Sequence, residues 1–178
     1  MQRRTLLVMF AFLIVCPAVQ AQFAGTGTTT MSVSVGPEAA LQVTTSTTTL
    51  AAVGSIFNNY TGVTNLTYKI RSTTSTGTGT ITAKVTTDFS PVGGPSVATP
   101  PSGGDALNYT CTVSAPGTAC TGTVTSSTTA STSVATFGAG AHSALAGNTA
   151  SASWTLTNDP VYASGAYTAT VTYTISST

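Results

Sequence analysis

Apolar side chains occupy every second position in one stretch of this chain after another, with Thr or Ser between them. Successive side chains of a strand point to opposite faces, so this period of two predicts strands with one buried and one wet face. No stretch carries an apolar stripe of helical period, although a short helical turn around 139–146 stays compatible with the sequence. The alternating runs are 31–35, 41–43, 66–71, 81–86, 107–114, 152–156 and 167–175.

The abundance of Thr, Ser, Gly and Ala has two interpretations, a disordered stalk or an all-β domain whose Thr side chains lie on pleated surfaces. The ordered alternation of apolar residues favours the second, because a stalk has none. Clusters of Gly, Pro, Asn and Ser separate the runs, as turns require. We therefore predict an all-β fold, an immunoglobulin-like β-sandwich of about seven to nine antiparallel strands, with a jelly roll or a small barrel as the alternative.

The first residues, MQRRTLLVMFAFLIVCPAVQAQF, have the features of a secretory signal peptide. Arg3 and Arg4 precede an apolar run over 6–16, which is shorter than a membrane-spanning helix, and Val19-Gln20-Ala21 forms a small-x-small cleavage site. We expect residues 1–21 to be removed and the protein to be secreted, periplasmic or exposed on the cell surface. A membrane anchor is the alternative, and lipidation at Cys16 is disfavoured by its bulky neighbour Val15.

The remainder is expected to form a flexible Gly/Thr-rich arm over 22–30 and one β-sandwich domain over 31–178. The Pro/Gly-rich stretch 91–104 (PVGGPSVATPPSGG) is interpreted as a long loop. It could instead separate two small domains, but neither half would then bury much apolar surface.

Cys111 and Cys120 are the cysteines that remain after cleavage. An even pair in an exported protein indicates a disulfide, and the Ala115-Pro116-Gly117 turn between them predicts that the bond pins a hairpin. Two free buried thiols are the alternative.

Charged residues make up only 5% of the chain. After cleavage the cations are Lys69, Arg71 and Lys84, against four acids, so no basic patch is available to neutralise a phosphate backbone. No basic amphipathic helix offers binding to a lipid surface. We expect neither nucleic-acid binding nor membrane association once the signal peptide is gone.

No set of residues predicts an enzyme. His142 is the only histidine and lies among small residues typical of a surface loop. A multi-histidine zinc site is therefore impossible, and the chain has no nucleophile-elbow motif. The acids Glu38, Asp88, Asp105 and Asp159 are far apart in the sequence, which favours neither a glycosidase pair nor a calcium loop. We expect no catalytic residues, no cofactor and no metal.

Aromatic residues near strand ends are the remaining candidates for ligand contact. Tyr162 lies in a predicted loop, where its ring could stack on a sugar. Trp154 alternates with Ala152 and Leu156, which predicts a core position, with a sugar-stacking role as the alternative. A carbohydrate- or cell-wall-binding module is the corresponding functional hypothesis, with cell-wall or host glycans as partners.

Residues 165–175 follow the pattern G-x-Y-x-x-x-V-x-Y-x-I. This stretch resembles the last strand of bacterial surface β-sandwiches, namely the chaperone–usher pilins and the spore coat protein U-like group. The string Trp154-Thr155-Leu156, with Pro160 behind it, is similar to part of the WxL cell-wall-binding domains. These resemblances imply a bacterial surface or fimbria-like structural protein.

The low charge supports assembly independently. Charged side chains on edge strands normally prevent pairing with another chain, and few are available here. Met31, Val33 and Val35 follow the flexible arm and form a candidate assembly strand that could be donated to a neighbour, or kept in its own sandwich. We therefore expect an exported, non-enzymatic structural or adhesive protein of the cell surface, whose partners are copies of itself or other surface subunits.

Overall fold

The structure is a computed structural model that describes residues 28–178. The chain divides into two units, Met1–Ser34 and Val35–Thr178. The predicted signal peptide and residues 22–27 of the predicted arm lie outside the described residues. In the first unit residues 28–34 form no strand, and in the second unit strands are the only regular elements. The described residues include no helix that is long and apolar enough to cross a membrane.

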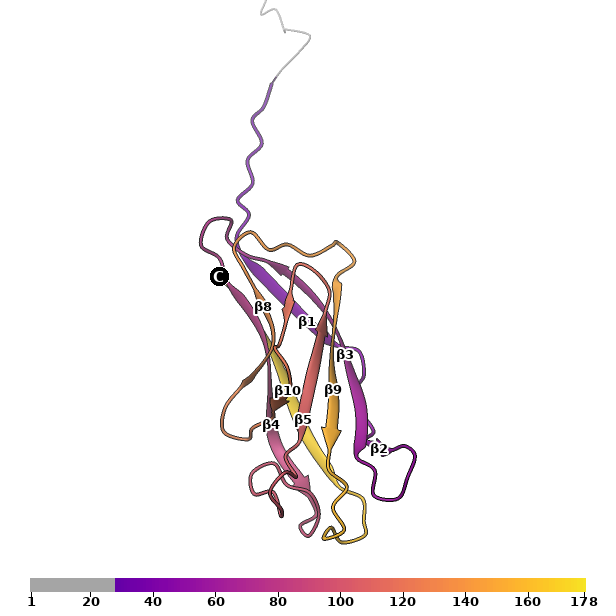
Figure 1. The fold of residues 1–178 in the computed structure, drawn as a ribbon. Coiled ribbons are helices and arrows are strands. Elements are labelled where there is room, and N and C mark those ends of the chain that lie inside the picture. Colours follow the sequence, from indigo (N-terminus) through magenta and orange to yellow (C-terminus); the bar gives the residue numbers. More distant parts are fainter. Residues whose placement is uncertain (1–27) are drawn as a thin grey trace, which may run out of the picture. The chain divides into compact units, whose positions relative to one another are not determined.

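The second unit is a β-sandwich, as predicted, built from two antiparallel sheets (Figure 1). Its ten strands are β1 (Glu38–Val43), β2 (Ala51–Ala52), β3 (Tyr60–Arg71), β4 (Gly79–Ser90), β5 (Asn108–Val113), β6 (Thr118–Ala119), β7 (Val124–Thr125), β8 (Thr132–Phe137), β9 (Asn148–Leu156) and β10 (Thr168–Ser177). Three of them, β2, β6 and β7, are only two residues long.

The first sheet has the order β1-β3-β9-β5-β7, and β2 pairs with the start of β3 on the same edge as β1. The second sheet has the order β10-β4-β8-β6. The two outermost strands on one side of the sandwich are therefore β1 and β10, the first and the last strand in the sequence. On the other side the outermost strands are β7 and β6.

The core lies where the predicted apolar faces of the two sheets meet. Tyr68 of β3, Ile81 of β4 and Val134 of β8 are completely buried. The ring of Tyr109 packs against that of Trp154 at 4.8 Å between centroids. The alternating Thr and Ser residues face outward from the same strands, as the period of two predicts.

Residues 31–35 form no strand, contrary to the expectation from their alternation. Their apolar side chains are exposed, at 91% for Met31, 86% for Val33 and 62% for Val35. The first strand begins instead at Glu38, after Gly36 and Pro37. An alternating sequence forms a strand only when its backbone can hydrogen-bond to a neighbouring strand, and residues 31–35 have no such neighbour among the described residues.

Candidate binding groove

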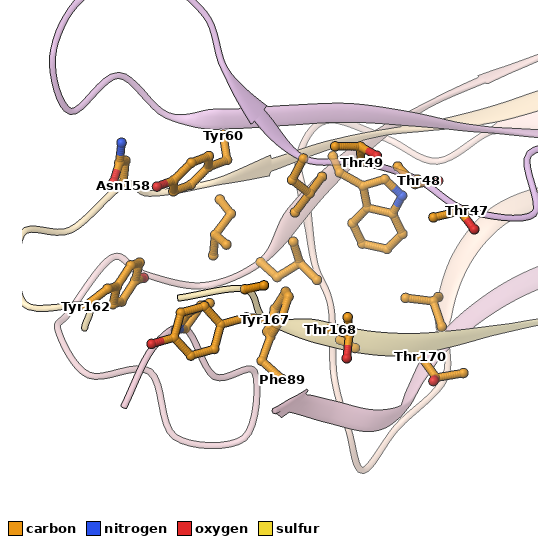
Figure 2. A pocket seen from close by; sticks show the side chains of 18 of the residues that line it. Thr47, Thr48, Thr49, Tyr60, Phe89, Asn158, Tyr162, Tyr167, Thr168 and Thr170 are labelled. Atoms are coloured by element: carbon orange, nitrogen blue, oxygen red, sulfur yellow. The ribbon is translucent and has the colours of Figure 1, made fainter. Parts of the chain in front are cut away.

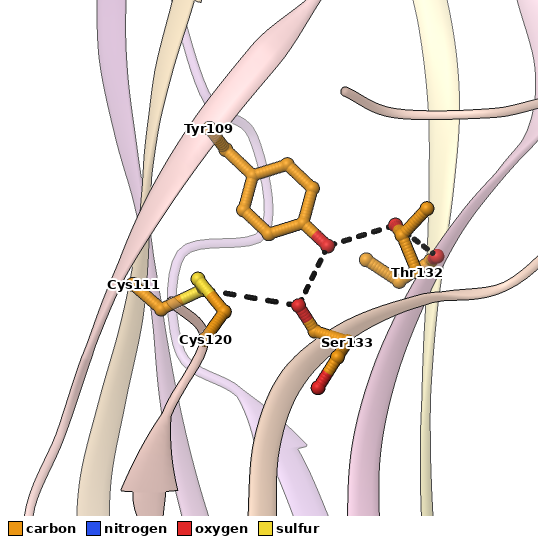
Figure 3. The surroundings of a disulfide bond; sticks show 6 residues. Tyr109, Cys111, Cys120, Thr132 and Ser133 are labelled. Carbon is orange, nitrogen blue, oxygen red and sulfur yellow. Dashed lines mark hydrogen bonds between the residues drawn. A yellow bond between two sulfur atoms is a disulfide. The ribbon is translucent and has the colours of Figure 1, made fainter. Parts of the chain in front are cut away.

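One edge of the sandwich is covalently fixed by a disulfide between Cys111 and Cys120, whose Cα atoms lie 5.5 Å apart (Figure 3). The bond was predicted, but its setting differs from the expected hairpin. Cys111 belongs to β5 of the first sheet, whereas Cys120 follows β6 of the second. The Ala115-Pro116-Gly117 turn carries the chain from one sheet to the other, so the disulfide joins the two layers.

Polar contacts support the same edge. The Tyr109 hydroxyl lies 2.8 Å from Thr132 Oγ1 and 3.0 Å from the Ser133 carbonyl oxygen, across the two sheets. Thr132 in turn donates to the Ala83 carbonyl at 3.0 Å. This edge is therefore closed by both covalent and hydrogen bonds.

The opposite edge is open. Strand β10 pairs with β4 on one side, and no strand of the described residues pairs with its other side. Its inward row consists of Ala169, Val171, Tyr173 and Ile175, all only half-buried. The residues opposite Val171 and Ile175 on β4, Val85 and Ile81, are by contrast at most 1% exposed. Val171, Tyr173 and Ile175 pack against the core, but they are more exposed than the β4 residues because β10 is an edge strand.

The first sheet is also interrupted on this side. After β1, residues 44–50 leave the edge of β3 and run past it until β2 pairs again. Thr44 N still donates to the Asn65 carbonyl at 2.9 Å. Gly62 lets residues 49 and 50 approach, since a Cβ there would lie 2.6 Å from the Thr49 carbonyl oxygen. The segment 44–50 is thus held beside β3 without extending the sheet.

Between segment 44–50 and β10 lies a groove with a volume of about 910 Å³. Figure 2 shows Thr47, Thr48 and Thr49 on one side of it and Thr168 and Thr170 on the other. Its inner wall includes Leu107, Trp154 and Leu156. The groove is lined by apolar side chains at its base and by Thr side chains along its two sides.

Trp154 lies at the base of the groove and not on an open surface. It is only 4% exposed, which confirms the predicted core position. Its Nε1 donates to Thr64 Oγ1 at 3.0 Å, and Thr64 Oγ1 lies 2.6 Å from Thr48 Oγ1. A ligand can therefore meet Trp154 only from within the groove.

The second predicted contact residue, Tyr162, also lines the groove, at the end where aromatic side chains gather. Figure 2 shows it near Tyr60, Tyr167 and Phe89. Its hydroxyl is buried close to the Asp105 carboxylate but forms no hydrogen bond of normal geometry. Burial raises the pKa of Tyr162 strongly, and the negative charges of Asp105 and Asp159 raise it further.

Tyr173 of β10 has the second buried hydroxyl without a partner in the described residues. Burial raises its pKa as well, although nearby Thr64 and Trp154 lower it. Both unpartnered hydroxyls therefore belong to the same groove. Buried hydroxyls are normally hydrogen-bonded, so these two are exceptions within the described residues.

The other singled-out polar residues have structural positions. His142 lies in an exposed loop, with Nδ1 2.9 Å from the Gly140 carbonyl oxygen. Glu38 forms an exposed ion pair with Arg71 at 3.0 Å. Within residues 28–178 no three His, Cys, Asp or Glu side chains gather as metal ligands would.

The sequence separates Asp105 and Asp159, yet the fold brings both near Tyr162 at the aromatic end of the groove. Asp105 is 2% exposed and accepts a hydrogen bond from Ser102 N at 3.2 Å. Asp159 accepts one from Val161 N at 2.8 Å. No local sequence pattern signals this meeting, because it depends on how two loops fold toward each other.

The chain matches no family model, no curated protein and no solved structure. Its function is therefore inferred from the groove and its surroundings.

Proposed function

We propose that this protein is an exported, non-enzymatic subunit of a bacterial surface structure, with an immunoglobulin-like sandwich that assembles by strand addition. The groove accepts the segment Met31–Val35 of another copy. The observation that carries the proposal is the free edge of β10, whose half-buried apolar row is left without a covering strand.

The donated segment has the chemistry that the groove requires. Met31, Val33 and Val35 are exposed in their own chain and alternate with Ser32 and Ser34. In an extended strand these three side chains point to one face and span about 13 Å. Ala169, Val171 and Tyr173 recur at the same spacing along β10, so one strand can cover all three.

Strand addition also supplies polar partners. Backbone N–H and C=O groups along a free strand edge pair readily with an added strand. The oxidising environment outside the cytoplasm, in which a disulfide persists, agrees with export.

The test measures the molar mass of the chain from residue 22 onward by light scattering, over a range of concentrations. We expect oligomers for this chain, and monomers for a version in which Met31, Val33 and Val35 are all replaced by Ser. The control carries Ser32→Thr and Ser34→Thr, which keep the apolar row, and should assemble normally. Unchanged assembly of the triple Ser variant would exclude 31–35 as the donated strand.

A second candidate function, binding of cell-wall or host glycans, is favoured by the aromatic end of the groove. Tyr60, Tyr162 and Tyr167 there offer flat apolar faces on which a sugar ring can stack. Sedimentation with insoluble peptidoglycan or cellulose tests it. Retention that is lost in Tyr162→Ala, but kept in Val63→Ala at an exposed position of β3, would support this function over assembly.

A further inference from the structure

Large apolar side chains are exposed on three loops at one end of the sandwich. The loop between β2 and β3 carries Val53, Ile56 and Phe57, exposed by 70%, 90% and 56%. The loop after β4 carries Val92, exposed by 95%, and the loop after β9 carries Val161, exposed by 61%. Figure 1 shows these loops together at the end where β9 stops and β10 starts. We call these five residues the apolar rim.

The three loops that carry the apolar rim also line the groove, with Pro95 and Tyr162 among its lining residues. Phe57 lines the groove itself, directly beside Ile56. The loops that carry Val92 and Val161 are joined by a hydrogen bond from Ala163 N to the Gly93 carbonyl at 2.8 Å. At the other end β1 and β10 lie against each other, and Ser177 Oγ of β10 donates to the Arg71 carbonyl at 2.8 Å. A strand that is attached to a whole domain can leave the groove only past the apolar rim.

The direction of an added strand follows from the closed end of the groove, because the donor's own sandwich begins after Val35 and must lie beyond the apolar rim. Thr178 N donates to the Thr78 carbonyl, so by alternation the backbone groups of Val171 and Tyr173 point to the free edge. An antiparallel strand along this edge starts at the closed end and finishes at the apolar rim. Val35, the last residue of the donated segment, is then the residue nearest the rim.

The connection between the donated segment and its own sandwich is short. Only Gly36 and Pro37 separate Val35 from the start of β1 at Glu38, a span of about 10 Å even when fully extended. Leu145 borders the same hollow as Glu38 and is 94% exposed. The end of the donor sandwich that carries Leu145, here called the Leu145 end, must therefore lie close to the acceptor's apolar rim.

We infer that the apolar rim of one copy packs against the Leu145 end of the next copy, the one whose segment fills the groove. This inference rests on the proposed strand addition and adds a second contact to it. The two surfaces lie at opposite ends of the sandwich, so the contact is head-to-tail and builds an open filament. It also covers apolar side chains that a solitary domain leaves in water.

Cross-linking between two variants, each with one free cysteine besides the disulfide, tests the contact. Full chains from residue 22 with Ile56→Cys and with Leu145→Cys are mixed, allowed to assemble, and treated with a short bis-maleimide. We expect a product containing one copy of each variant, and little product from either variant alone. Val63→Cys, on an exposed outer face of β3, replaces Ile56→Cys in the control and should give no such product.

A substitution gives an independent measurement. Ile56→Asp combined with Val161→Asp is expected to weaken assembly about tenfold, because two apolar contacts are lost. Persistent oligomers that are unaffected by this variant and give no mixed cross-link would overturn the rim contact alone. Absence of oligomers from the unmodified chain would overturn the proposed strand addition, and the rim contact with it.

Discussion

Trp154 Nε1 donates to Thr64 Oγ1 at 3.0 Å, across the strand pair β9 and β3, at the base of the groove. Thr64 is 5% exposed and Trp154 4%, so neither group has water as an alternative partner. The contact links the core to the wall of the groove, because Thr64 also meets Thr48 of segment 44–50.

Thr64→Val is therefore expected to destabilise the fold by about 1–3 kcal/mol, since it leaves a buried indole N–H without a partner while keeping the side-chain shape. Urea unfolding followed by Trp154 fluorescence measures the change. Thr61→Val on the exposed face of β3 is the matched control and should alter stability little. Equal effects of the two variants would contradict the importance of the bond.

Removing the disulfide is expected to cost about 2–3 kcal/mol, because the bond closes a loop of separation 9 and joins the two sheets. Cys111→Ala combined with Cys120→Ala should unfold at a lower urea concentration than the oxidised chain. The reduced wild-type chain serves as the control and should behave like the double variant. A midpoint unchanged by reduction would show that the non-covalent contacts at this edge suffice.

The Asp88 carboxylate accepts hydrogen bonds from the loop after β4, and we therefore expect the stability of the fold to fall in acid. Burial alone would raise its pKa, but hydrogen bonds from Val97 N, Ser96 Oγ, Ala98 N and Phe89 N outweigh burial and lower it. A pKa that is lower in the folded than in the unfolded state stabilises the fold above the unfolded value of about 3.9. That contribution is lost as the pH falls further, through the folded pKa.

Thermal unfolding between pH 7 and pH 2 checks this expectation. Asp88→Asn should lower stability at pH 7 by an amount on the order of 1 kcal/mol, and should show a smaller additional loss in acid than the wild type. Parallel pH profiles of the two proteins would mean that other carboxyl groups govern the acid response.

Gly94 supports the aromatic end of the groove. A Cβ at this position would lie 2.3 Å from the ring of Tyr167, whose hydroxyl donates to the Ala163 carbonyl at 2.7 Å. Gly94→Ala is thus expected to displace the ring and cost about 1–3 kcal/mol. Gly103→Ala, in the same loop with no atom within 4 Å of the added carbon, should be close to neutral in the same urea titration.

The acceptor side of the proposed assembly can be tested on β10. Val171→Asp places a charge in the groove and is expected to weaken oligomer formation at least about tenfold. Thr172→Asp points outward from the next position and should leave assembly unchanged. Circular dichroism confirms that both variants are folded, and light scattering then compares them. Assembly that survives Val171→Asp in a folded chain would exclude the groove as the acceptor.

Period-two alternation predicted the strands that carry most of the core. The runs at 66–71, 81–86 and 152–156 fall in β3, β4 and β9, and all but the first residue of the run at 167–175 falls in β10. Strand β8 was missed, because Val134 and Ala135 are both buried next to a register shift, which breaks the alternation. The two-residue strands are too short to show any period.

The groove could not be predicted from local patterns. It depends on which strands are outermost and on segment 44–50 leaving β3, and sheet order is a property of long-range pairing. Tyr162 and Trp154 were both candidates for ligand contact and both line the groove. Their sequence neighbours do not reveal that Trp154 lies at its base, or that Asp105 and Asp159 lie near Tyr162.

The disulfide also determines where the native sandwich can move. Because the layers are joined by the disulfide between β5 and the residue after β6, we expect small opening motions to pivot about that edge and to be largest at the middle of β10 and at segment 44–50. Amide hydrogens of Val171 and Tyr173, which face the free edge, should exchange with solvent fastest among the long strands. The edge that would receive another strand is thus also the edge at which we expect local opening to be most frequent.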